Sequence, residues 1–196
     1  MRRLLILVLA GLLIWQFLLR QEGIELGPGV RAAQIPVQQD IESPEVFRVD
    51  TYRITPLAEF RIRAKVLSRE TYSMGRESDL SPIDLALGWG RMSDEQVLQS
   101  IAISQSGRWY RWRARDFPIP RREIETHSAN MHIIPADETI ADVIDEFPEG
   151  DIVELDGFLV RADADDGWRW VSSLTRDDTG ARACELFYVR RARSVL

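Results

Sequence analysis

Residues 57–68 read Leu-Ala-Glu-Phe-Arg-Ile-Arg-Ala-Lys-Val-Leu-Ser and give the clearest structural signal in the chain. From Ala58 to Val66, apolar side chains alternate with charged ones at every second position. A period of two is typical of a β-strand that buries one face and exposes the other. The stretch therefore predicts a long strand at the border of a core, and Pro56 separates it from a preceding strand over residues 46–54.

The C-terminal third predicts three more strands, over residues 152–161, 168–173 and 183–190, with an acidic turn between the first two. A strand over residues 131–134 and a helix that begins after Asp137 precede them. The order of strand, helix, strand and hairpin is compatible with a small, partly open barrel of the OB type. Several other small barrels share that order.

The middle of the chain predicts short helices at three places. Ser81-Pro82 would open one that Gly88 ends, because Ser favours the N-cap and Pro the first helical position. Similar start signals stand at Ser93 and Pro120. Together the elements predict an α+β domain with a mainly antiparallel sheet and three or four short helices.

The first twenty residues predict a membrane anchor. Two arginines precede an apolar run over residues 4–19, interrupted only by Gln16, and such a run forms a helix of about 24 Å. A cleavable signal peptide has the same charged start and apolar middle, but no small-x-small cleavage site ends this run. We therefore expect a single uncleaved transmembrane helix over residues 1–20, with the N-terminus in the cytoplasm by the positive-inside rule.

The chain after the anchor divides in two. The prolines and glycines of residues 21–44 predict an extended tether, and residues 45–196 predict one exported α+β domain. This division predicts a single-pass protein of a bacterial inner membrane whose C-terminal domain lies in the periplasm.

Composition and charge limit the classes of function. The chain has 25 basic and 31 acidic residues and a formal net charge of −6, which argues against a nucleic-acid partner. Cys184 is the single cysteine, so an intrachain disulfide and a cysteine-rich zinc site are excluded. No motif predicts a cofactor or a metal ion.

A few residues could carry catalysis. His127 and His132 are the only histidines, and neither a strand nor a regular helix turns residues at that spacing toward one side. Either could act as a base for the hydroxyl-rich loop Ser172–Thr179, where Ser172 is the first candidate nucleophile. Cys184 could instead pair with a histidine. The alternatives are a structural polar segment around the histidines and a buried, inert thiol.

Tryptophan is the most unusual feature, with six residues in the chain. Aromatic and arginine side chains that share a strand face predict a groove for a partner, and ordinary cross-strand packing is the alternative. The candidate binding residues are Trp109, Arg111, Arg113, Arg115, Trp168 and Trp170.

These features favour a membrane-anchored periplasmic binding or assembly module of a bacterial envelope complex, with a protein partner. The arginines of residues 108–122 and the twelve carboxylates between residues 137 and 166 would form faces of opposite charge, which allows self-association. The alternative is an exported, membrane-anchored hydrolase that uses His127 or His132 with the loop Ser172–Thr179.

Overall fold

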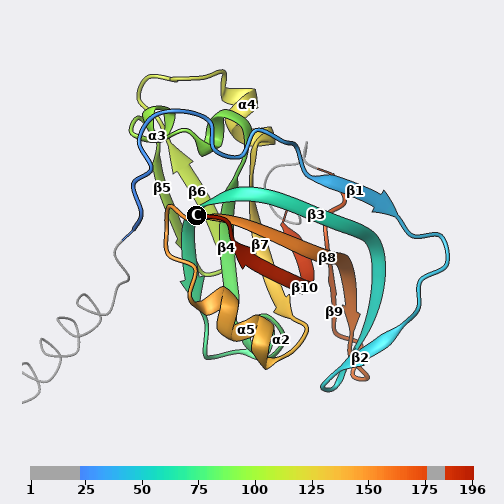
Figure 1. Ribbon diagram of the computed structural model, residues 1–196. Coiled ribbons are helices and arrows are strands. Elements are labelled where there is room, and N and C mark those ends of the chain that lie inside the picture. Colours follow the sequence, from blue (N-terminus) through green and yellow to red (C-terminus); the bar gives the residue numbers. More distant parts are fainter. Residues whose placement is uncertain (1–22, 176–183) are drawn as a thin grey trace, which may run out of the picture.

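The computed structural model describes residues 23–175 and 184–196 (Figure 1). The predicted anchor over residues 1–20 lies outside the described residues. Within the two described ranges, no helix combines the length and the apolar character that crossing a membrane requires. The domain is mainly β-sheet with a few short helices, which confirms the predicted fold class at that level.

Strand β3 (Tyr52–Thr71) is the longest element and contains the alternating stretch 57–68. Its even-numbered residues from Ala58 to Val66 are buried, whereas Arg61 and Arg63 point to solvent. One continuous strand therefore supplies both an inner apolar face and an outer charged face. The predicted break at Pro56 is wrong, because the strand continues through Pro56 with a local shift in register.

The pairings of five strands close into a ring. Residues 53–65 of β3 pair with β8 (Ile152–Asp163), and residues 65–71 pair with β4 (Ile83–Gly88). From β4 the pairings continue to β7 (Ser128–Pro135), then to β10 (Glu185–Ser194), and from β10 back to β8. All of these pairings are antiparallel except that of β7 with β10, which is parallel. The main core lies inside the ring, where the Phe60 and Phe187 rings meet at 5.1 Å between centroids.

Helix α5 (Glu138–Asp145) connects β7 to β8 and packs Ile144 into the core. The Asp137 carboxylate caps it by accepting a hydrogen bond of 2.9 Å from the Ile140 amide, as the sequence predicts. Three shorter helices complete the fold: α2 (Arg76–Leu80), α3 (Glu95–Leu98) and α4 (Arg121–Thr126). A 3-10 turn, η1 (Gly90–Ser93), precedes α3.

The helix predicted after Ser81-Pro82 is wrong, because residues 83–88 form strand β4. All six residues of β4 are buried. A strand covered on both faces has no polar alternation, so its apolar run resembles a short buried helix. The Ser-Pro pair then mimics a helix start.

Residues 24–41, within the predicted tether, lie against the domain. The Ile24 amide donates to the Glu149 carbonyl at 2.7 Å, and the fully buried Ala32 accepts from the Gly90 amide at 2.8 Å. Further along, β1 (Val37–Asp40) pairs with β3 at the edge of the sheet, and β2 (Phe47–Val49) forms a short hairpin with the start of β3. The sheet therefore begins before residue 45.

Gly157 marks a close approach between two strands of the ring. A Cβ atom added there would lie 1.9 Å from the Tyr188 carbonyl oxygen of β10. We expect Gly157→Ala to lower the free energy of unfolding by about 3 kcal/mol, because the strands must move apart. Thermal unfolding of the full chain, followed by circular dichroism, measures the change.

Gly107→Asn is the matched control. Gly107 has a φ of +57° and no atom within 4 Å of an added Cβ, and Asn tolerates that conformation. We expect this variant to stay within about 0.5 kcal/mol of the wild type. Equal melting temperatures for the two variants would contradict the close packing of β8 against β10.

Candidate functional site

A buried carboxylate, Asp84 of β4, organises the polar side chains on the outer face of the ring. Asp84 is fully buried, and its Oδ1 accepts a hydrogen bond of 2.7 Å from Nη1 of Arg108. The same oxygen lies 2.9 Å from Nδ1 of His132, the residue opposite Asp84 on β7. One carboxylate thus fixes a guanidinium and an imidazole side by side.

Arg108 reaches Asp84 from the tip of a separate hairpin, formed by β5 (Ala102–Ser106) and β6 (Trp109–Arg113). Gly107 and Arg108 both have positive φ angles, as the tight turns of two-residue hairpins require. The Arg108 amide donates to the Tyr72 hydroxyl at 2.9 Å, and its guanidinium lies 3.7 Å from the centre of the Tyr72 ring. Burial raises the pKa of Tyr72, so the phenol is neutral where it accepts this bond.

The second oxygen of Asp84, Oδ2, is buried and has no hydrogen-bond partner among the described residues. Buried carboxylate oxygens nearly always accept hydrogen bonds. The cluster therefore contains one buried acceptor that the donors of the described residues do not fill.

Tryptophan side chains cover this polar cluster. The Trp170 ring, on β9 (Arg169–Val171), lies tilted against His132 at 4.8 Å between ring centroids, and the Trp168 ring lies 6.0 Å from that of Trp170. Together with the tip of the hairpin they surround a cavity of about 750 Å³, here called the tryptophan pocket. Its lining residues are Glu77, Arg108, Trp109, His132, Trp168, Arg169, Trp170, Val171, Ser172 and Cys184.

The predicted binding residues divide between two places. Trp109, Trp168 and Trp170 all line the tryptophan pocket. Arg113 and Arg115 line a different cavity of about 1190 Å³ between the hairpin and α4. Arg111 lies on the exposed face of the hairpin, where Nη1 donates to the Ser106 hydroxyl at 3.1 Å. The structure therefore groups the tryptophans and separates them from the three arginines.

The catalytic candidates are also separated. His127 lies at the end of α4, where its Nδ1 is 3.1 Å from the Thr126 hydroxyl, outside the residues that line the tryptophan pocket. His132 and Cys184 both line the pocket, and the Asn130 amide lies 4.0 Å from the Cys184 sulfur. The two histidines thus belong to different surroundings.

Ser172 connects two strands. Its hydroxyl donates to the Ser173 carbonyl at 2.8 Å and accepts from the Leu186 amide at 3.0 Å. A nucleophilic serine would donate its hydroxyl proton to a base. The Ser172 hydroxyl donates to a backbone carbonyl, so its contacts indicate a structural role. Residues 176–179 of the predicted hydroxyl-rich loop lie outside the described residues.

The most buried member of the site, Asp84, was missed from the sequence. One feature of the sequence does point to Asp84: it is a carboxylate inside the apolar run Ile83–Leu87. Because an aspartate is rarely buried without a partner, its position indicates a buried polar contact. The partners themselves are 24 and 48 positions away in the chain, so the local pattern could not identify them.

The predicted opposition of a basic and an acidic face is wrong in part. The sheet register places Asp156 of the acidic segment between Arg61 and Arg191, with both guanidiniums within 2.9 Å. Burial raises the pKa of Asp156, but the hydrogen bonds from these two arginines outweigh it, and the pKa is lowered overall. Part of the acidic segment is therefore covered by arginines.

Comparisons with protein-family models, curated proteins and solved structures find no match. Among the described residues, no group of three or more His, Cys, Asp or Glu side chains is placed to hold a metal ion. The geometry of the tryptophan pocket is therefore the basis for an assignment of function.

Loss of the Asp84 charge tests the cluster. We expect Asp84→Asn to lower the free energy of unfolding by about 3 kcal/mol, because the Arg108 guanidinium loses its carboxylate partner. Asp79→Asn makes the same change of charge at an exposed residue of α2, and a change within about 0.5 kcal/mol is expected there. Chemical unfolding followed by tryptophan fluorescence gives both values, and equal effects would contradict the role of Asp84.

Proposed function

We propose that the protein is a membrane-anchored periplasmic binding or assembly module of a bacterial envelope complex. The tryptophan pocket would receive an extended segment of a protein partner. The observation that carries this proposal is the convergence of three tryptophans on the Asp84–Arg108–His132 cluster. Tryptophan and arginine are the residue types most enriched at the energetic centres of protein interfaces.

The ring of strands supports a barrel of the OB type. In that architecture, ligands bind on the second and third strands and on the loops after the first and fourth strands. Here the second and third strands of the ring are β4 and β7, which carry Asp84 and His132. The first loop contributes Glu77, and the loop after β8 contributes Trp168 and Trp170. The pocket thus occupies the position at which such barrels bind their ligands.

The rim of the pocket favours a partner over a purely internal role. Trp109 is 43% exposed and Val171 is 44% exposed, and both line the same cavity. Large apolar side chains that are exposed together around a polar cluster are typical of an interaction site. An extended peptide could cover both and contact Arg108 and His132, which also line the pocket.

The hydrolase alternative has less support. His127 and His132 lie in different surroundings, and the Ser172 hydroxyl is engaged between Ser173 and Leu186. One part of the hydrolase interpretation agrees with the geometry. His132 contacts Asp84 and lines the same pocket as Cys184.

Site-specific crosslinking in living cells tests the binding proposal. A photoreactive phenylalanine analogue in place of Trp109 or Val171 is expected to give a discrete crosslinked product of higher mass. The same analogue at Phe117, which is 50% exposed but lies in the other cavity, is the control. The variant Arg111→Glu/Arg113→Glu should keep the product, because neither residue lines the pocket. Absence of a product at both rim positions, or an equal product at Phe117, would contradict the proposal.

The topology has its own test. The proposed anchor over residues 1–20 leaves the N-terminus in the cytoplasm and exports the remainder. A reporter that is active only in the cytoplasm, fused after Leu196, is therefore expected to be inactive, whereas the same fusion without residues 1–20 should be active. Activity of the full-length fusion would exclude the proposed location.

A further inference from the structure

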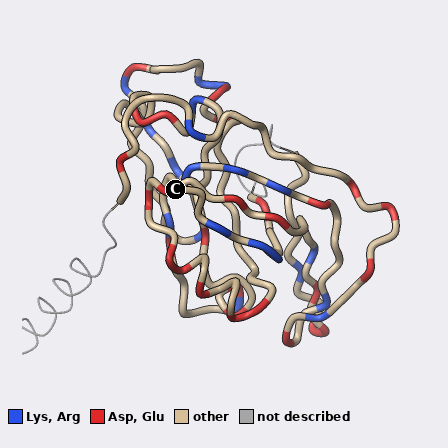
Figure 2. Tube along the Cα trace, viewed as in Figure 1, with Lys and Arg blue, Asp and Glu red and all other residues tan. Residues whose placement is uncertain are grey.

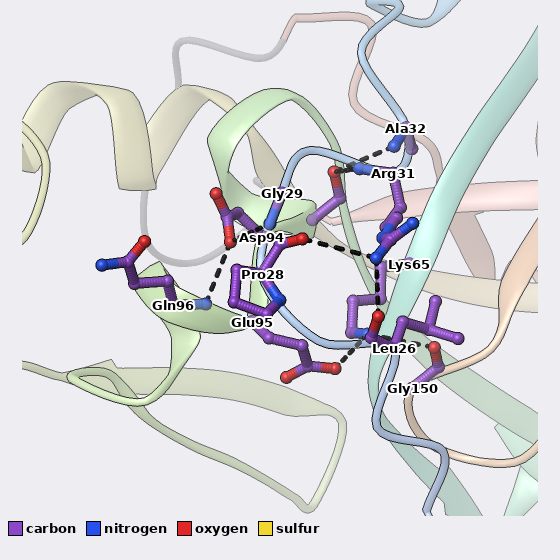
Figure 3. A network of polar contacts seen from close by, with 11 residues as sticks. Leu26, Pro28, Gly29, Arg31, Ala32, Lys65, Asp94, Glu95, Gln96 and Gly150 are labelled. Atoms are coloured by element: carbon purple, nitrogen blue, oxygen red, sulfur yellow. Dashed lines mark hydrogen bonds and ion pairs between the residues drawn. The ribbon is translucent and has the colours of Figure 1, made fainter.

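The segment from Ile24 to Ala32, here called the strap, is fastened to the domain by hydrogen bonds along its length (Figure 3). The Ser93 hydroxyl accepts from the amides of Arg31 and Ala32, at 3.0 and 2.9 Å. The Gly29 amide donates to Oδ1 of Asp94 at 2.9 Å. These bonds satisfy the backbone of a segment that has no regular secondary structure, so the strap is a part of the domain.

The start of the strap is fixed at the β3–β8 end of the ring. Ile24 lies so close to Gly150 that a Cβ atom added there would be 1.9 Å from the Ile24 carbonyl oxygen. Gly150 is itself held by the buried Lys65, whose Nζ donates to the Gly150 carbonyl at 3.1 Å and to Oε1 of Glu95 at 2.5 Å. Ile24 therefore has a defined position on the domain.

The position of Ile24 limits the distance between the domain and the proposed anchor. Residues 21–23 alone separate Arg20 from Ile24, and an extended chain of that length spans at most about 14 Å. This step rests on the proposed function, because it requires residues 1–20 to lie in the membrane. If they do, the end of the ring at Gly150 is held close to the bilayer surface.

A positively charged surface begins beside that end. At this end of the pairing between β3 and β8, Lys65 lies opposite Ile152. The next outward-facing pairs along the two strands are Arg63 with Glu154 and Arg61 with Asp156. Strand β10 adds arginines on the other side of β8, and Figure 2 shows blue positions of β3 and β10 on either side of the red positions of β8. The arginine face, as we call it, consists of Arg61, Arg63, Arg190, Arg191 and Arg193.

These five arginines form ion pairs with two carboxylates, Glu154 and Asp156. Counting also the exposed Glu59, which lies two residues before Arg61 on the same face of β3, this surface carries an excess of two positive charges on a chain whose formal net charge is −6. The side chains of Arg61, Arg191 and Arg193 are at least 70% exposed. Exposed ion pairs contribute little to stability, so these guanidiniums can exchange a carboxylate for a phosphate at small cost.

Apolar side chains accompany the charge. The arginine face borders a groove of about 670 Å³ that Ile35 and Val37 also line. Ile35 is 69% exposed and Val37 is 64% exposed. Basic and apolar side chains together are typical of surfaces that lie on anionic membranes.

We infer that the arginine face docks on anionic phospholipid headgroups of the membrane that holds the proposed anchor, with Ile35 and Val37 at the depth of the headgroups. The short link before the strap brings this surface to the bilayer, and the excess of guanidinium groups selects anionic lipid. The tryptophan pocket is lined by different residues, so its partner is not excluded by the docking.

An environment-sensitive fluorophore on a cysteine at position 37 tests the inference. The full chain carries Cys184→Ser and Val37→Cys and is reconstituted in nanodiscs of phosphatidylglycerol or of phosphatidylcholine. We expect a blue-shifted, stronger emission in phosphatidylglycerol alone. Val46→Cys is the matched control, because Val46 is 48% exposed and precedes β2 at the opposite end of the β3–β8 pairing.

Charge variants make the test specific. Arg191→Gln/Arg193→Gln is expected to lower the ratio of docked to undocked domain about thirtyfold, as the loss of two charges near an anionic surface would. Arg111→Gln/Arg113→Gln removes the same charge from the hairpin and should leave the emission unchanged. The inference would be overturned if the emission at position 37 were the same in phosphatidylglycerol and phosphatidylcholine, or if positions 37 and 46 gave the same emission. A shift that appears in detergent and grows with protein concentration would assign the surface to a second copy and overturn it as well.

Failure of the anchor is a separate outcome. If the chain does not co-elute with nanodiscs of either lipid, the proposed membrane anchor fails. The same labelled chain is then mixed with preformed phosphatidylglycerol vesicles. A blue shift at position 37 would support the arginine face as a lipid surface, and its absence would overturn it.

Discussion

The pairing of β3 with β8 closes the sheet, and both candidate surfaces depend on it. Twelve register pairs, from Arg53 with Asp163 to Lys65 with Ile152, join β3 to β8. The last part of β3, residues 65–71, pairs with β4. One strand can belong to both pairings because its twenty residues run past the end of β8 and continue along β4. Closure buries the apolar side chains inside the ring and leaves Arg61, Arg63 and the carboxylates they pair with on its outside.

The outer surface of the ring then has two distinct regions. Over β4 and β7, the hairpin and β9 cover the outer side chains, and polar groups such as Asp84 are buried there with partners. Over β3, β8 and β10 the arginines of the arginine face are exposed, and they form transverse rows with Glu154 and Asp156. The buried polar cluster suits specific recognition, because the fully buried Asp84 fixes the positions of Arg108 and His132. The exposed rows suit a charged surface that needs no fixed geometry.

The sequence predicts what local pattern determines. The alternation of residues 57–68, the strand at 152–161 and the helix after Asp137 are confirmed, since each depends on neighbouring residues. Strand β4 could not be recognised, because its two buried faces remove the alternation that marks a strand. The sequence predicts the tryptophans of the pocket, because tryptophan is a residue type typical of binding sites. It does not predict the Asp84 cluster or the pairing of Asp156 with Arg61, 95 positions away, because sheet register brings these residues together.

The most direct measurement of an occupied tryptophan pocket is hydroxyl-radical footprinting of Trp109 in the intact cell envelope and in the purified chain. Phe117 is a reference of similar exposure in the other cavity. If a partner fills the pocket, Trp109 is oxidised more slowly in the envelope than in the purified chain, while the oxidation rate of Phe117 is unchanged. Equal oxidation rates of Trp109 in the two samples would contradict the account.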